Sequence, residues 1–289
     1  MKKILSRLVL MVLLFSLTLT AYASPITVLG KGELPSFSDD AEVMKIYFFN
    51  IFARDSFLVQ CGGKNMLIDC GEMDYGRLYI APSLKALGVD HIDVAVNTHP
   101  DDDHIGGFFS LVDLIPIDKF YTCFPADYCD LQRDFLKLAE KKNIPVEWIT
   151  EDTDLSFGGI SIWSFQNLSY PKSPNACSLV IHLTYGESTA ILLSDIPYEI
   201  HHILAAEKGD ALRADLIKVP HHGYNTPCLD LMDCIQPKYA IITHWRYERI
   251  MKTVSMLSSR GCPTVFSAEG IVEFSTDGNE WQMRQFKVL

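Results

Sequence analysis

Two histidines and three aspartates lie within six consecutive residues of this chain. They form the run His99-Pro100-Asp101-Asp102-Asp103-His104, which comes directly after an apolar stretch over 92–96 that predicts a buried strand. Side chains at the point where a strand stops and a helix starts can reach one common centre. Imidazole nitrogens and carboxylate oxygens together suit Zn²⁺, Mn²⁺ or Fe, and the lack of cysteine in the run argues against a thiolate zinc site.

The same run also has a simpler interpretation, as a solvated acidic loop at the start of a helix near His104. Aspartate is a preferred helix cap and is favourable near a helix N-terminus. The flanking histidines and the following Gly106-Gly107 favour the metal site, since the glycines leave room for backbone or substrate to approach closely.

The run from His99 to Gly107 resembles the H-x-H-x-D-H signature of the metallo-β-lactamase fold, with Asp101 at the position of the second histidine. With Ile105-Gly106-Gly107 after it, it is similar to the hydrolase domain at the C-terminal end of DNA-uptake competence proteins and to related exported hydrolases. The resemblance implies an α/β fold, namely a four-layer αββα sandwich of two mixed β-sheets with outer helices.

Three later segments continue the resemblance in the same order along the chain. They are Asn175 with Ser178-Leu179-Val180, then the run 192–195 that ends in Asp195, then the run 216–223 that contains His221 and His222. Each segment is weak alone, and their order makes the match specific.

The resemblance implies a site with two divalent metal ions, Zn²⁺ or Mn²⁺. We expect His99 and Asp101 to bind the first ion, Asp103 and His104 to bind the second, and Asp195 to bridge both. Asp101 in place of a histidine makes the first site harder and more anionic, which admits Mn²⁺.

The histidine pair at 221 and 222 has two expected roles. One imidazole would complete the second metal site, and the other would hydrogen-bond the substrate or protonate the leaving group. We favour His222 as the ligand, and we expect His221 and Asp103 to be catalytic residues.

Three further residues are expected near the site, as support or substrate contacts. Asp69, in Asp-x-Gly at a strand end, would support the metal ligands, although a turn-initiating aspartate is an equal alternative. Asn175 stands where many relatives have a third histidine, and a turn role is as well supported. His244 ends a strand, but the chain continues with Trp245 where the relatives have Gly-His-Pro.

Two metal ions about 3.5–4 Å apart ionise a shared water near neutral pH and stabilise an in-line displacement. The leading hypothesis is therefore an exported metal-dependent hydrolase that uses such a hydroxide, phosphodiesterase-like, on a phosphoester or other small-molecule substrate. Hydrolysis of lactones or thioesters stays open. A non-catalytic or single-metal binding protein with the same fold is the alternative from another class.

The N-terminus and the charge limit where the protein acts and on what. Lys2, Lys3 and Arg7 precede an apolar run and the small residues near Ala23, so residues 1–23 predict a cleaved signal peptide and export, with no membrane span after cleavage. Removing its three positive charges changes the net charge from −11 to −14. Such an acidic chain disfavours nucleic acid as a partner without excluding it, because nucleic-acid binders usually present a basic face.

Eight cysteines leave both disulfides and free thiols open in an exported protein. Cys61 and Cys70 flank a hairpin turn and could face one another.

The rest of the 289 residues predicts one domain over 24–289, with a lead-in of unclear structure at 24–42. A strand, a glycine turn and a second strand that ends in aspartate occur twice, over 56–69 and 175–195, as in a sandwich of two similar halves. Helices are predicted at 78–87, 105–115, 130–143 and 247–259.

Overall fold

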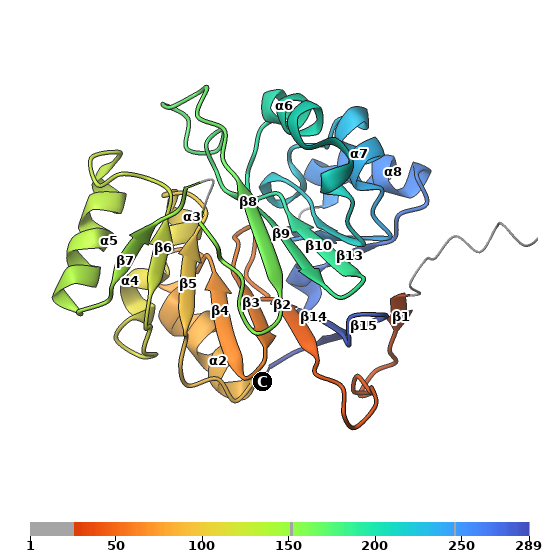
Figure 1. Ribbon diagram of the computed structural model, residues 1–289, viewed down its shortest axis with the longest axis horizontal. Coiled ribbons are helices and arrows are strands. Elements are labelled where there is room, and N and C mark those ends of the chain that lie inside the picture. Colours follow the sequence, from red (N-terminus) through yellow and green to blue (C-terminus); the bar gives the residue numbers. More distant parts are fainter. Residues whose placement is uncertain (1–25, 151–152, 246, 289) are drawn as a thin grey trace, which may run out of the picture.

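The computed structural model describes residues 26–150, 153–245 and 247–288. The predicted signal peptide over 1–23 lies outside these residues. Two β-sheets pack face to face, and helices cover the outer face of each sheet (Figure 1). This arrangement confirms the predicted four-layer αββα sandwich.

The first sheet has nine strands and carries the histidine-rich run at the end of one of them. Its strands β2, β3 and β4 form an antiparallel meander, and β4, β5, β6 and β7 continue it in parallel. In sheet order the strands are β1 (Ile26–Val28), β15 (Trp281–Phe286), β14 (Ile271–Thr276), β2 (Met44–Phe48), β3 (Phe57–Cys61), β4 (Lys64–Ile68), β5 (Val94–Asn97), β6 (Phe120–Thr122) and β7 (Val146–Trp148).

The second sheet has six strands and contributes the other candidate ligands. The strands β8, β9 and β10 are antiparallel, and β10 to β13 are parallel. In sheet order they are β13 (Thr264–Phe266), β12 (Tyr239–Ile242), β11 (Leu216–Lys218), β10 (Ser188–Leu192), β9 (Val180–Tyr185) and β8 (Ser161–Phe165).

The helices divide between the two outer faces. The first sheet is covered by η1 (Gly76–Ile80), α2 (Ala81–Ala86), α3 (Asp102–Ile105), α4 (Phe108–Leu111) and α5 (Asp130–Lys141). The second is covered by α6 (Tyr198–Lys208), α7 (Leu229–Ile235) and α8 (Tyr247–Ser259). Short turns of helix complete the described chain at η2 (Gly209–Leu212), η3 (His221–Gly223) and η4 (Ser267–Glu269).

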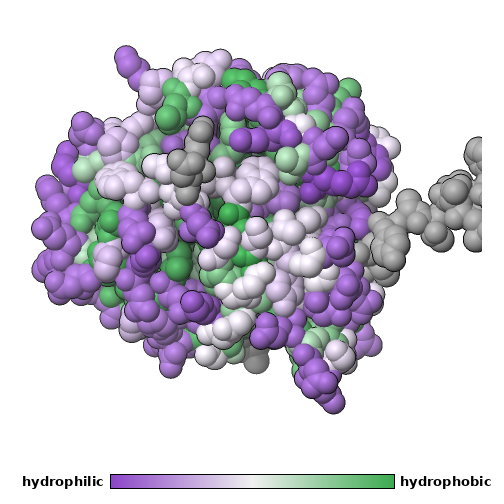
Figure 2. Space-filling model, viewed as in Figure 1, coloured by the Kyte–Doolittle hydropathy of each residue, from purple (hydrophilic) through white to green (hydrophobic). Residues whose placement is uncertain are grey.

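Alternation of side chains along the strands explains how one sheet serves two cores. In β2, Met44, Ile46 and Phe48 pack between the sheets, whereas Tyr47 packs under the outer helices. Successive side chains of a strand point to opposite faces, so a strand buried on both faces is apolar at nearly every position. The face of the molecule in Figure 2 is largely hydrophilic, with hydrophobic side chains in small scattered patches.

The expected elements agree with the structure except in two places. The lead-in contains β1, which pairs in parallel with β15. The predicted helix over 105–115 is wrong in its start and continuity: α3 already begins at Asp102, and Gly106 and Gly107 separate it from α4. A Cβ at Gly107 would lie 1.9 Å from the carbonyl oxygen of Cys70, so glycine is needed for this close contact with the end of β4.

The repeated strand, turn and strand pattern is confirmed as two antiparallel hairpins. One is β3 with β4, which leads into Asp69, and the other is β9 with β10, which leads toward Asp195. The equivalent hairpins lie in different sheets, and both aspartates reach the same edge of the sandwich.

All eight cysteines are free thiols in the structure. Cys61 belongs to the core between the sheets, and Cys70 belongs to the core under the outer helices. The suggested pairing of these two is therefore wrong, because the first sheet separates them. Among the described residues, no helix has the length and hydrophobicity needed to cross a membrane.

Candidate metal centre

The candidate ligands meet at one edge of the sandwich because several strands end there. The run with His99 and His104 follows β5, Asp195 follows β10, and the 221–222 pair follows β11. Parallel neighbouring strands place their carboxyl ends at a common edge, which is where sites form in α/β sheets. The first sheet thus supplies one side of the centre and the second sheet supplies the other.

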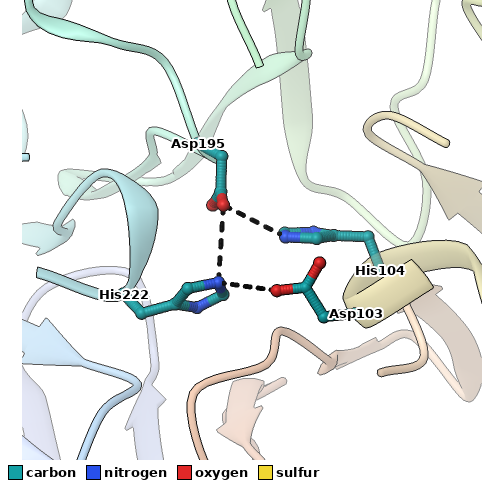
Figure 3. Close-up of side chains that lie close together, drawn as sticks. All are labelled: Asp103, His104, Asp195 and His222. Atoms are coloured by element: carbon teal, nitrogen blue, oxygen red, sulfur yellow. Dashed lines mark hydrogen bonds and ion pairs between the residues drawn. The ribbon is translucent and has the colours of Figure 1, made fainter. Parts of the chain in front are cut away.

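Four side chains converge closely: Asp103, His104, Asp195 and His222 (Figure 3). Each offers a ligand atom, and these atoms all lie within 4.8 Å of one another. Oδ2 of Asp195 is 3.4 Å from Nε2 of His104 and 3.4 Å from Nε2 of His222, and Oδ2 of Asp103 is 3.2 Å from Nε2 of His222. We call Asp103, His104 and His222 the braced half of the centre, and Asp195 stands beside it.

His104 is held in place by Asp69. Its Nδ1 donates a hydrogen bond to Oδ2 of Asp69 over 2.7 Å, and both side chains are buried. Asp69 also accepts from the amide of Thr98 at 2.8 Å, which ties the end of β4 to the end of β5. A carboxylate on the far nitrogen of a ligand histidine fixes the ring and raises its basicity, and the supporting role of Asp69 stays a prediction.

His222 is held in the same way by an aspartate that the sequence analysis missed. Its Nδ1 lies 3.0 Å from Oδ1 of Asp55 and 3.0 Å from Oγ1 of Thr243. Thr243 in turn donates to the same oxygen of Asp55 over 2.7 Å. Both imidazoles of the braced half therefore bear a hydrogen on Nδ1, so a cation that displaced the proton of Nε2 would meet the Nε2 lone pair at the centre.

Lys218 is a second residue that the sequence analysis missed. Its ammonium is fully buried, forms an ion pair with Asp55 and donates to the carbonyl of Ser194 at 3.0 Å. It also lies 3.5 Å from Oδ1 of Asp195, so the other oxygen, Oδ2, is left to face the histidines. A charged residue inside the apolar strand Leu216-Ile217-Lys218, just before the histidine pair, was the available sequence signal.

The remaining predicted ligands are more loosely arranged, and we call His99, Asp101 and Asn175 the open half. Nε2 of His99 is 3.6 Å from Oδ2 of Asp101, whose side chain is 38% exposed. On its other nitrogen, Nδ1, His99 meets the Thr98 hydroxyl at 3.1 Å and has no carboxylate partner among the described residues. The ring centroids of His99 and His104 are 3.9 Å apart, with the rings tilted by 49°, which places the two halves side by side.

Asn175 lies in a turn that contacts both sheets. The turn is tied to the run after β5 by the bond from the Leu179 amide to the Thr98 carbonyl at 3.0 Å. It is tied to the second sheet by the bond from the Asp195 amide to the Ser178 hydroxyl at 3.3 Å. Oδ1 of Asn175 is buried without a hydrogen-bond partner among the described residues, so an amide oxygen is available there.

His221 and His244 lie at the outer side of the braced half. Nε2 of His221 is 3.7 Å from Oδ2 of Asp195, and its side chain is 34% exposed. The Tyr224 hydroxyl contacts Nε2 of His244 at 2.5 Å, and its ring packs edge-on against His221 with centroids 5.5 Å apart. His244 therefore reaches the centre through Tyr224, another residue that sequence reasoning missed.

Backbone strain accumulates at these positions. Among the described residues that are not glycine, seven have a positive φ, and four of them are Asp69, Ser194, His221 and His222. Such left-handed conformations cost about 1–3 kcal/mol each and persist where surrounding contacts impose them. Here they turn the ends of three strands toward one point.

The charges of the braced half favour a cation. Burial alone would raise the pKa of Asp103, but the hydrogen bond from His222 and the charge of His104 lower it to about 2. Burial likewise opposes the charged form of His222, yet Asp195 and Asp55 raise its pKa well above the ordinary histidine value. The same balance, with Asp195 and Asp69, raises the pKa of His104. Positive charge is thus stabilised where the carboxylates meet.

The donor set fits divalent cations. Nε2 of His99 and Nε2 of His104 are buried and make no hydrogen bond within the described chain. The braced half with Asp195 offers two nitrogens and two carboxylates, which suits the tetrahedral preference of Zn²⁺. The open half offers more oxygen, which suits harder ions such as Mn²⁺. The ligand roles of the individual residues stay predictions.

Two layers of sheet between outer helices, with a histidine and aspartate centre at their edge, define a class of metal-binding α/β sandwich. Residues 50–245 match the Metallo-beta-lactamase superfamily, and the chain belongs to this superfamily.

Individual relatives agree with this membership. The chain is 26% identical over 200 residues to "Competence protein ComA" of Neisseria gonorrhoeae, which covers 64% of this chain and 25% of that protein. It is 28% identical over 185 residues to "ComE operon protein 3" of Bacillus subtilis. The aligned region covers 60% of this chain and 23% of that protein. The chain thus spans about a quarter of the length of the curated relatives it matches.

A solved structure supports the fold. The metallo-beta-lactamase fold protein YhfI from Bacillus subtilis superposes with a TM-score of 0.52 at 15% identity, over 78% of this chain and 96% of that one. The predicted resemblance to this fold and to competence proteins is confirmed.

Proposed function

We propose that this chain is a metal-dependent hydrolase that acts on phosphoesters. The observation that carries the proposal is the position of Oδ2 of Asp195, which lies 3.4 Å from Nε2 of both His104 and His222 and 3.7 Å from Nε2 of His221. One carboxylate oxygen thus faces imidazoles from both sheets, which supports Asp195 as a ligand at the centre of the site.

Each residue has a defined part in this proposal. His104, Asp103 and His222 would hold one divalent cation, His99 and Asp101 would hold the other, and Asp195 would contact both. When bound, the two cations supply an activated water and neutralise charge on a phosphoryl group. Asp69 and Asp55 keep the imidazole lone pairs directed inward, and His221 faces the substrate from the exposed side.

The substrate that we propose is a small phosphodiester. The acidic net charge, −11 over the full chain, opposes a long polyanion, because nucleic-acid binders gain affinity by neutralising phosphates. The names of the competence relatives do not enter this choice of substrate. Lactones and thioesters remain second choices, and we propose export on the basis of the N-terminal sequence.

The test combines metal content with turnover. Purified protein should bind about two equivalents of Mn²⁺ or Zn²⁺ and hydrolyse bis-p-nitrophenyl phosphate faster than lactones, thioesters or single-stranded DNA. Asp195→Asn should lower metal affinity and kcat/KM by more than about 100-fold, because it removes a ligand and not merely a supporting contact.

Asp134→Asn is the control, since Asp134 is exposed on α5, pairs with Arg133 and Lys137, and belongs to none of the groups of described side chains that could hold a metal ion. It should leave metal content and turnover unchanged. Full activity and full metal content in Asp195→Asn would contradict the bridging role.

The looseness of the open half favours a second candidate, a binding protein with one ion. The group of side chains whose donor atoms lie within 4.8 Å of one another contains Asp103, His104, Asp195 and His222, but neither His99 nor Asp101. A stoichiometry of one ion, without turnover of any ester above, would favour this candidate.

A further inference from the structure

His221 differs from the other imidazoles of the centre in what its Nδ1 meets. Nδ1 of His104 donates to Asp69, and Nδ1 of His222 faces the acceptor Asp55. Nδ1 of His221 instead lies 3.2 Å from Nδ2 of Asn225, an amide nitrogen that can only donate.

A second contact fixes the orientation of this amide. Nδ2 of Asn225 also donates to the carbonyl oxygen of Ile196 over 3.3 Å. A carbonyl can only accept, so turning the amide over would set two oxygens against each other. The Asn225 nitrogen therefore faces His221, and Nδ1 of His221 must be the acceptor.

A neutral imidazole has one hydrogen, so accepting at Nδ1 leaves that hydrogen on Nε2. Nε2 is the nitrogen that faces Oδ2 of Asp195 at 3.7 Å. A nitrogen that bears a hydrogen has no lone pair for a metal ion. His221 thus bears its hydrogen on Nε2, whereas His222, whose Nδ1 faces the acceptor Asp55, would offer Nε2 to a cation that displaced its proton.

The ring of His221 is held in this direction by its surroundings. Its φ of 50° and the φ of 53° at His222 turn the two rings 68° apart. Tyr224 packs edge-on against the His221 ring at an interplanar angle of 81°. One third of the His221 side chain is exposed, so a ligand can reach this ring from solvent.

We infer that Asn225 is a positioning residue that keeps neutral His221 in the tautomer with hydrogen on Nε2, so that His221 hydrogen-bonds an anionic substrate oxygen. This inference rests on the proposed function for the identity of the substrate. It decides whether His221 hydrogen-bonds the substrate or protonates the leaving group. Giving up its only hydrogen would leave an imidazolate, so the ring stabilises charge and does not transfer a proton. Neutral histidines that act as electrophiles in this way are known in other enzymes.

The inference also specifies the substrate class. Without a proton from His221, the leaving oxygen departs as an anion, so diesters with acidic leaving alcohols should be hydrolysed far faster than dialkyl diesters. A hydrogen bond from Nε2 to a non-leaving phosphoryl oxygen would help all of these diesters to the same degree.

The first test reads the tautomer directly and needs no activity. Long-range ¹H–¹⁵N correlation spectra of the Zn²⁺-loaded and metal-free protein at pH 8 report which nitrogen of each histidine bears hydrogen. The His221 signals are identified by their loss in His221→Gln. We expect hydrogen on Nε2 of His221 and, in Asn225→Asp, a shift of that hydrogen to Nδ1, because a carboxylate accepts from Nδ1.

Thr226→Ser is the matched control for the tautomer. Thr226 bonds to the Thr253 hydroxyl at 2.9 Å, and serine keeps that hydroxyl. The control should show the wild-type tautomer. Hydrogen on Nδ1 of His221 in the wild-type protein, or the same tautomer in Asn225→Asp as in wild type, would overturn the inference.

The second test uses phosphodiesters whose leaving alcohols differ in acidity. Asn225→Asp and His221→Ala should lower kcat/KM by about 10–100-fold, and by the same factor for every diester, whereas His221→Gln, which keeps a donor, should lose less. A loss that grows as the leaving alcohol becomes less acidic would show proton transfer and overturn the inferred role. Wild-type protein that hydrolyses none of the diesters would refute the proposed function, while the spectra would still decide the tautomer.

Discussion

The braced half and the open half of the metal centre are built on different principles. In the braced half, each imidazole has a buried carboxylate behind it, Asp69 for His104 and Asp55 for His222. In the open half, Nδ1 of His99 meets only hydroxyl groups and has no carboxylate behind it among the described residues. Ligands that are already oriented lose less entropy on binding, so the braced half should fill first and more tightly.

Removing one imidazole from each half should give the largest difference. His222→Ala should lower metal affinity by more than about 100-fold and abolish turnover, because the better oriented site loses a ligand. His99→Ala should leave about one bound ion at the braced half. Metal analysis after dialysis against limiting Zn²⁺ measures both. Equal losses in the two variants would show that the halves do not differ.

The next largest difference in metal affinity should come from changes to the residues that support the ligands. Asp55→Asn should weaken metal binding by about 10–100-fold, whereas Ser194→Ala, which removes the hydroxyl 3.5 Å from Nδ1 of His99, should cost less than about 10-fold. Asp55→Asn also removes the closer of the two carboxylates that pair with buried Lys218 and leaves only Asp195, which should destabilise the protein by up to about 3–5 kcal/mol in urea unfolding. Similar metal affinities in the two variants would contradict the comparison.

The number of protons released on metal binding should also differ between the two halves. The pKa values of His104 and His222 are raised in the metal-free fold, so both rings hold extra protons at neutral pH that a cation must displace. Titration calorimetry at pH 7 in buffers of different ionisation enthalpy should show about two protons released at the first, tighter binding step.

The same raised pKa values have a consequence for stability, with a definite sign. Their stabilisation of the metal-free protein is fully present below the unfolded histidine pKa of about 6.5 and is lost as the pH rises through the folded values. Bound Zn²⁺ should remove this dependence. Parallel denaturation curves of the metal-free wild-type protein and of His222→Gln measure the stability that His222 contributes at each pH. A contribution that increases above pH 7 would contradict this prediction.

The smallest effect should come from ligand chemistry in the open half. Asp101→His replaces an oxygen donor with a nitrogen donor, so the ratio of Zn²⁺ to Mn²⁺ affinity at the second binding step should rise by about 10-fold. Competition between the two ions, measured by metal analysis, checks this. An unchanged ratio would mean that Asp101 is not a ligand.

The sequence allowed prediction of those residues that lie in the segments that carry the resemblance. His104, Asp195 and His222 each follow an apolar strand, and strand ends in a sandwich meet at one edge, so their convergence could be foreseen. Asp55 could not be found this way: it contacts Thr243 across 188 residues, and nothing in its loop marks that contact. Lys218 and Asn225 gain their roles only from the orientation of neighbouring side chains.

The fold shows the same limit. Alternating and continuous apolar runs predicted the strands, and the two hairpins were recognisable by their glycine turns. The break between α3 and α4 was missed because it depends on the contact of Gly107 with the carbonyl of Cys70, a residue 37 positions earlier in the chain. The hydrophobic periodicity of a segment depends only on its own residues, so it cannot predict a contact with a distant residue.

The braced half takes Asp103 and His104 from α3, after β5, and His222 from the segment that follows β11, and Asp195 beside it follows β10. A cation held there would cross-link the two sheets, so its binding energy would add to the cohesion of the sandwich. At a free concentration of 100 times Kd that contribution is about 2.7 kcal/mol. The resistance of the protein to heat and proteolysis would then follow the supply of trace metal in its surroundings.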